Sequence, residues 1–418
     1  MLQRNTSLPV AAWVYKLVSG LLIFSLIVKL GIETYRLPWH DYNSYGLSEF
    51  LVNFQGGFVR RGLLGELLYR LCSVLHVPPT YIIIPACYLA YFACLGIFLR
   101  LFRKRELNWW LILSPFMCGI TIYIVRKDYM LILMLLAMYG LIARHGSKNA
   151  VTLAGVITLS CLGLFLHEAF IFWGLPIVFL LLLSQSKRAG IAYGAIICAT
   201  FLVLAYFKGD SAVALRIHQS WRALCPHELT DTIPATINSL GWSTGETAMS
   251  HFTLNFLDKI GPVPVWCLRP IVLLCSYYLV TNIFYVFRRS ASSFTDTDRT
   301  NLSALYLFSL VMLLPMFLFL SCDYGRLYQY ATISALGTFV IFKPARLSRL
   351  FPRGVYSLTA KINRQMDRIC RPNPWVVIII LLLIAACPTK CYIKGVIANG
   401  VLTSIPYYCL GALRQLLH

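Results

Sequence analysis

The chain has few charged residues and very few acidic ones. Only 13% of its 418 residues are Asp, Glu, Lys or Arg, and 16 residues are acidic, whereas 58% are hydrophobic. Such a composition supplies too little polar side chain to cover a soluble globular protein. Together with a mean hydropathy of +0.70, it predicts an all-α polytopic membrane protein forming a single transmembrane domain over residues 1–418.

Disulfide and metal patterns are also lacking. Most of the fourteen cysteines lie in apolar runs, where cysteine acts as a small hydrophobic residue, and the spacing of Cys387 and Cys391 is only a weak disulfide signal. Ile171 stands four residues after His167, which excludes the zinc-protease motif. No metal site is predicted. No cofactor is required by these patterns, although a divalent cation is compatible with the acids described below.

Long apolar runs dominate what is present. About 20 apolar residues cross a membrane, and on that measure we predict eleven spans, or twelve if the tail 396–417 also crosses. They cover residues 12–31, 81–102, 108–124, 129–143, 150–166, 169–184, 190–207, 262–287, 301–320, 329–342 and 375–388.

The basic residues predict the orientation of these spans. When successive spans cross the membrane in alternating directions, one membrane face has 21 Lys and Arg residues and 4 acidic residues, and it includes the basic segment 343–374. The other membrane face has 16 Lys and Arg residues and 12 acidic residues. Basic loops favour the cytoplasm, so we expect a cytoplasmic N-terminus in the plasma membrane, and the net charge of +21 needs no nucleic-acid partner. The outer loops are then 32–80 and 208–261. Within the first of these, the leucine pattern of residues 62–76 predicts an amphipathic helix lying in the membrane interface.

Acidic residues gather at the predicted outer ends of the spans. They are Asp41, Asp128, Glu168 and Asp323. An acid near the hydrocarbon is costly unless it faces a cavity or a partner. Asp41, with His40, Tyr42 and Tyr45 close by, is a candidate general base for a hydroxyl, or else the cap of a following helix. Glu168 and His167 are either an acid–base pair or a hydrogen-bonded pair between helices.

Basic side chains accompany these acids. Arg60 and Arg61 follow two glycines, and such a pair binds either the phosphate of a substrate or lipid headgroups. Arg126 and Lys127 are further phosphate candidates, with Asp128 as a cation ligand, a base or their ion-pair partner. Arg326 is the last candidate, and Asp323 would support it or form a structural bridge with it. The aromatic residues of 208–261 suit either sugar stacking or an ordinary cap.

The order of these features resembles the GT-C superfamily of membrane glycosyltransferases, and more loosely the Wzy-like bacterial polysaccharide polymerases. The similarity rests on a first span followed by an outer loop with the early acid Asp41, an interfacial helix and many short hairpins, and on the paired arginines Arg60 and Arg61. The acid pair of many GT-C members is absent here. Metal dependence therefore does not follow from the resemblance.

The resemblance implies transfer of a sugar or oligosaccharide from a polyprenyl (pyro)phosphate carrier to a hydroxyl of a glycan acceptor, on the outer face and in company with other surface-glycan assembly proteins. Asp41 would activate the acceptor, Glu168 would be a second acid, and Arg60, Arg61, Arg126 and Arg326 would stabilise the leaving phosphate. A transporter or flippase of lipid-linked saccharides is the alternative, but it predicts polar residues along a path through the spans, whose middles are nearly free of charge. A scaffold in an assembly complex is a third reading.

Overall fold

The structure, a computed structural model, describes residues 7–36, 45–113, 125–225, 229, 231–253, 259–260, 263–288, 293–320 and 324–386. Over these ranges the regular structure is helical apart from one antiparallel pair of two-residue strands, in which Lys259 pairs with Pro264 and Ile260 with Val263. The predicted all-α class is confirmed. The predicted residues His40, Asp41, Tyr42 and Asp323 lie outside the described ranges, as does the side chain of Tyr45.

Contacts divide the chain into two compact units. The first unit comprises Met1–Gly31, Leu95–Ile122 and Ser250–His418, and the second comprises Ile32–Cys94 and Tyr123–Met249. Helix α4 (Thr80–Lys104) contributes its beginning to the second unit and its end to the first. Helix α12 (Thr244–Phe252) is likewise divided, mostly within the second.

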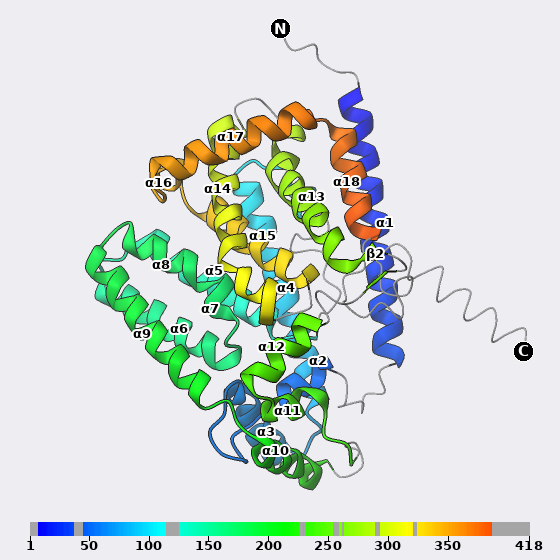
Figure 1. Ribbon diagram of the computed structural model, residues 1–418, viewed down its shortest axis with the longest axis vertical. Helices are drawn as coiled ribbons and strands as arrows, with labels where there is room; N and C mark the ends of the chain where they lie inside the picture. Colours follow the sequence, from blue (N-terminus) through cyan, green and yellow to red (C-terminus); the bar gives the residue numbers. More distant parts are fainter. Residues whose placement is uncertain are drawn as a thin grey trace, which may run out of the picture. The chain divides into compact units, whose positions relative to one another are not determined.

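The first unit is built on three long helices that pack in sequence, α13, α14 and α15, with α18 against α13 (Figure 1). Its elements are α1 (Ser7–Arg36), η2 (Trp109–Leu113), β1 (Lys259–Ile260), β2 (Val263–Pro264), α13 (Val265–Val286), α14 (Asp296–Met312), η5 (Met316–Leu320), α15 (Tyr324–Ile341), α16 (Pro344–Leu347), α17 (Arg353–Ile369) and α18 (Pro374–Ala386). Helix α14 begins at a capping box in which Thr295 and Asp298 satisfy each other's backbone N–H groups.

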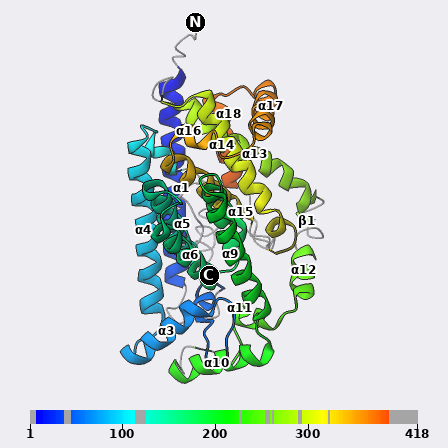
Figure 2. The same cartoon turned by 90° about the vertical axis from the view of Figure 1, so that its left-hand side faces the viewer.

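The second unit is a helical bundle with smaller helices at one end. Its elements are α2 (Tyr45–Ser48), η1 (Glu49–Leu51), α3 (Gly62–Leu75), α5 (Asp128–His145), α6 (Ala150–Leu166), α7 (Phe170–Trp173), α8 (Leu175–Leu183), α9 (Lys187–Tyr206), α10 (Ser211–Leu224), α11 (Ala235–Asn238) and η3 (Ser239–Gly241). In Figures 1 and 2, α3, α10 and α11 lie together beyond one end of α5, α6 and α9.

Three of the described helices are long and apolar enough to cross a membrane, namely α4, α5 and α9. Four shorter apolar stretches, Pro9–Phe24, Ala150–Leu166, Pro270–Val286 and Pro374–Leu383, overlap predicted spans. The expected span 169–184 is divided into α7 and α8 at Gly174, where a side chain would overlap the ring of Phe170. Membrane-type helices are thus present, and the count of eleven or twelve spans stays a prediction.

The predicted amphipathic helix is present as α3. Leu68 and Cys72 are buried on one side, whereas Leu67, Leu71 and Val74 are exposed. The helix ends at Leu75, and the following residue His76 takes a left-handed conformation shortly before two prolines. Because its exposed face is apolar, α3 suits an interface between water and lipid.

Candidate functional site

The loop that carries Arg60 and Arg61 is folded back onto α3. A side chain at Gly65 would overlap the carbonyl oxygen of Val52, so only glycine allows this close approach. The carboxylate of Glu66 accepts hydrogen bonds from the backbone N–H of Phe54 (3.1 Å) and the amide of Gln55 (2.9 Å). The chain before the two arginines is therefore fixed by the helix that follows them.

Helix α10 holds the same loop from its other side. Arg216 donates to the carbonyl oxygen of Gly56 (2.9 Å), and the indole of Trp221 donates to that of Leu51 (2.6 Å). Asn53 donates to the hydroxyl of Ser220 (3.0 Å). These contacts favour the interpretation of the segment 208–261 as a structural cap, because Arg216 and the fully buried Trp221 bond to backbone carbonyl groups.

Arg61 forms a two-point ion pair with Glu168. Its Nε and Nη2 lie 2.7 and 2.5 Å from the two carboxylate oxygens. Arg60 approaches the same carboxylate at 3.4 Å. Arg61 adopts a positive φ of 64° directly before α3, a conformation that costs a non-glycine residue about 1 kcal/mol or more. We infer that the ion pair offsets this cost.

His167 connects Glu168 to a carboxylate that the sequence reading overlooked. Its Nε2 lies 3.2 Å from a carboxylate oxygen of Glu49, which is 1% exposed, and its Nδ1 accepts a hydrogen bond from the backbone N–H of Ala169 (3.2 Å). The proton of neutral His167 is thereby assigned to Nε2, which donates to Glu49. With Nδ1 already accepting a hydrogen bond, His167 is placed to orient Glu49 rather than to act as a base.

Lys127 lies at the centre of these groups and is fully buried. Its ammonium donates to the carbonyl oxygens of Arg61 (3.3 Å) and Leu166 (3.4 Å) and lies 5.7 Å from the ring centre of Phe50. It thus connects the arginine loop to the end of α6. Arg126 and Asp128, which flank it at the start of α5, are 6% and 8% exposed.

These residues define the charged cluster, a term used below for the following set. It consists of Glu49, Arg60, Arg61, Arg126, Lys127, Asp128, His167 and Glu168. The set contains four cations and three carboxylates, so it carries a formal charge of +1 with His167 neutral. All its members belong to the second unit.

Burial and neighbouring charges set the protonation of the cluster. Burial lowers the pKa of Lys127 to about 8, partly opposed by Glu49 and Glu168. The pKa of His167 is lowered, by burial first and then by Arg61. For Glu168 burial raises the pKa, but the charge and hydrogen bonds of Arg61, with His167 and Arg60, outweigh burial and hold the pKa well below its usual range. At neutral pH Glu168 is therefore ionised and His167 uncharged.

The structure thus joins five of the predicted site residues through contacts, namely Arg60, Arg61, Lys127, His167 and Glu168, and the buried Arg126 and Asp128 adjoin Lys127 in the sequence. An ionised Glu168 paired with two arginines is better placed to orient them than to donate a proton. Arg326 lies in the first unit on α15, with its guanidinium 5.5 Å from the ring centre of Tyr330. Among the described residues no group of three or more His, Cys, Asp or Glu side chains is arranged to hold a metal ion.

Comparisons with known proteins add no assignment to this geometry. No family model matches the chain, and neither a curated protein nor a solved structure matches it.

Proposed function

We propose that the protein is a membrane glycosyltransferase or polysaccharide polymerase that uses a polyprenyl (pyro)phosphate-linked saccharide as donor. The observation that supports this best is the charged cluster, in which Arg60, Arg61 and Lys127 lie near the start of the apolar helix α5 and the end of the apolar helix α6. Cations in a poorly solvated site attract phosphate far more strongly than cations in water. Beside membrane helices, the natural phosphate ligand is one attached to a lipid.

The residues of the charged cluster would have different roles in the reaction. Arg60 and Arg126 would bind the phosphate oxygens, and charge developing on the leaving phosphate would be stabilised by them and by Lys127. Glu168 would hold Arg61 in place. Asp41, the candidate base on the acceptor hydroxyl, lies outside the described residues but belongs to the same first outer loop.

The setting of the reaction is part of the same proposal. The chain would cross the plasma membrane eleven or twelve times, with its N-terminus in the cytoplasm and the charged cluster on the outer side. The acceptor would be a glycan hydroxyl, and the donor's lipid tail would lie against apolar helices. The protein would serve bacterial surface-glycan assembly beside the proteins that make and export the donor.

A substitution at Asp41 tests the transfer step. We expect Asp41→Asn to abolish glycan product in cells, because the amide cannot accept the hydroxyl proton, while the protein stays abundant and inserted in the membrane. Product is measured by gel analysis of the surface glycan. Asp231→Asn, at an exposed acid of the second outer loop paired with Arg222, serves as the control and should leave product unchanged. Normal product amount and length in Asp41→Asn would contradict the proposal.

A further inference from the structure

A second polar site lies in the first unit, where α17 crosses the beginning of α14 (Figure 1). The crossing is fixed by buried hydrogen bonds. Tyr277 of α13 donates to the side-chain oxygen of Asn363 (2.7 Å), and the amide of Asn363 donates to Ser303 (3.1 Å). The hydroxyl of Tyr278 donates to the carbonyl oxygen of Arg371 just beyond α17 (3.1 Å).

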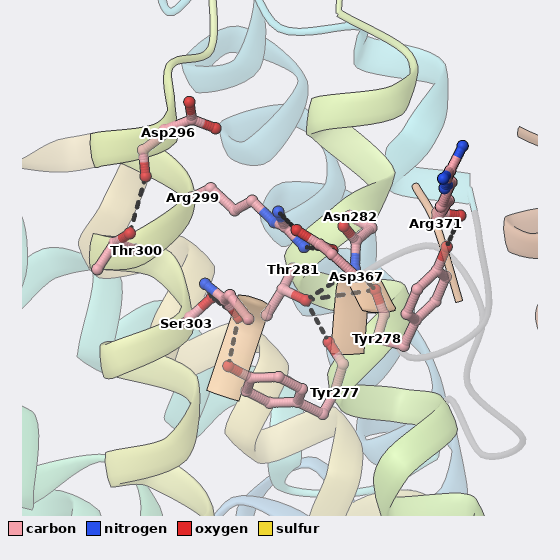
Figure 3. Close-up of polar contacts among 11 residues, drawn as sticks. Tyr277, Tyr278, Thr281, Asn282, Asp296, Arg299, Thr300, Ser303, Asp367 and Arg371 are labelled. Atoms are coloured by element: carbon pink, nitrogen blue, oxygen red, sulfur yellow. Dashed lines mark hydrogen bonds and ion pairs between the residues drawn. The ribbon is translucent and has the colours of Figure 1, made fainter. Parts of the chain in front are cut away.

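An ion pair strengthens this crossing. Arg299 of α14 donates to both carboxylate oxygens of Asp367, at 2.8 and 2.7 Å (Figure 3). The guanidinium of Arg299 is also 5.2 Å from the ring centre of Tyr285. Because Arg299 is 5% exposed, its charge is held in a poorly solvated place with one carboxylate as a partner.

A cavity of about 640 Å³ opens beside the ion pair. Its charged lining consists of Arg299, Arg364 and Arg371 with Asp296 and Asp367. The pair between Arg299 and Asp367 is neutral, so the exposed Arg364 and Arg371 outnumber Asp296 and leave the cavity with one excess positive charge. A volume of this size accommodates a phosphorylated headgroup.

The outer surface of α17 indicates where such a ligand comes from. Leu358 and Ile369 are 58% and 81% exposed and lie three helical turns apart, so they share one face of the helix. Arg353, Lys361 and Arg368 are exposed on the same helix. Exposed apolar side chains beside basic ones are typical of a helix lying on a membrane that contains anionic lipid.

We propose that this cavity binds the phosphate of an anionic phospholipid headgroup, with Arg364 and Arg371 as its ligands and Arg299 as a buried cation behind them. Guanidinium groups bind phosphate oxygens in pairs of hydrogen bonds. The site belongs to the first unit and does not depend on the function proposed for the charged cluster.

The test is native mass spectrometry of the full-length protein in detergent, titrated with phosphatidylglycerol. We expect one retained phosphatidylglycerol per protein, and at least a tenfold loss of its affinity in the double variant Arg364→Gln/Arg371→Gln. Both side chains are exposed, so the variant should fold. The control Lys343→Gln/Arg349→Gln removes the same charge from the same basic segment outside the cavity, and should retain the lipid.

A third variant makes the cavity more positive instead of less positive. Asp296→Asn removes a carboxylate from the cavity lining, and we expect it to increase lipid retention severalfold. An equal loss in the control double variant would show non-specific attraction and overturn the site. Equal retention of phosphatidylethanolamine, or displacement of the lipid by millimolar inorganic phosphate, would overturn the assignment to an anionic lipid.

Discussion

Arg61 is the residue that most clearly joins local conformation to the candidate site. It stands in a left-handed conformation before α3, its carbonyl oxygen accepts a hydrogen bond from Lys127, and its guanidinium is paired with Glu168. Arg61 thus connects three segments, namely the loop before α3, the start of α5 and the end of α6. A substrate phosphate arriving at Arg60 or Arg126 would meet a site that is already ordered.

We expect Glu168 to contribute to the stability of the folded protein through its ion pair with Arg61. Replacing Glu168 by Gln leaves the partly buried Arg61 without its carboxylate, so we expect Glu168→Gln to lower the free energy of unfolding at neutral pH by about 2 kcal/mol. The pKa of Glu168 is lowered by folding, so its contribution to stability is fully present above the unfolded pKa near 4.5 and is lost as the pH falls below that value. Thermal unfolding in detergent between pH 7 and about pH 3 measures both effects.

The control for Glu168 is Asp231→Asn, which also removes a carboxylate paired with an arginine. Asp231 and its partner Arg222 are 90% and 46% exposed, and exposed pairs contribute little. An unchanged melting temperature in Glu168→Gln, or a loss no larger than that of Asp231→Asn, would contradict the assignment of Arg61 and Glu168 as a partly buried pair.

Glu49, His167 and Glu168 also show what sequence reasoning can and cannot find at this scale. His167 and Glu168 were predicted because they stand alone between two apolar runs. Glu49 was missed, since it lies among the residues of a short loop helix that carries no other charge. The pairing of Arg61 with Glu168 joins residues 107 positions apart. Hydrophobic periodicity and local composition describe neighbours in the sequence, so neither could predict this pair.

At the scale of elements, α3 and the loop before it act as one piece. Gly65 allows the backbone of Val52 to touch α3, and α10 fixes the loop through Gly56 and Leu51. The amphipathic pattern of residues 62–76 predicted the helix closely, because spacing of leucines is a local property. The docking of α10 could not be predicted, since its donors, Arg216 and Trp221, equally suit sugar binding.

Gly65→Ala tests this docking. An added methyl group would overlap the carbonyl oxygen of Val52, so α3 and the loop must separate, and we expect a lower melting temperature with a destabilisation of about 2 kcal/mol. The control is Gly140→Ala in α5, where a methyl group meets no atom within 4 Å. That change should be neutral or stabilising because alanine favours helix. Equal melting temperatures for the two variants would contradict the close packing of Gly65.

At the scale of the whole molecule, the apolar composition is sufficient to predict helices suited to a membrane, but not how each run is divided. The run at 169–184 contains a break at Gly174, and the predicted span 301–320 begins earlier, at the capped Asp296, and ends in the π-helical segment Met316–Leu320. Such breaks depend on packing against neighbouring helices. Burial of the cluster's charges likewise depends on tertiary packing.

The central claim is that the charged cluster binds the phosphate of a lipid-linked donor. It is tested most directly by the affinity of the purified protein in lipid nanodiscs for polyprenyl pyrophosphate. Losing two charge-assisted contacts at about 1.5 kcal/mol or more each predicts that Arg60→Gln/Arg126→Gln weakens binding at least a hundredfold. Arg70→Gln, at an exposed arginine of α3, should bind as the unchanged protein does. Equal affinity in the double variant and in Arg70→Gln would contradict the account.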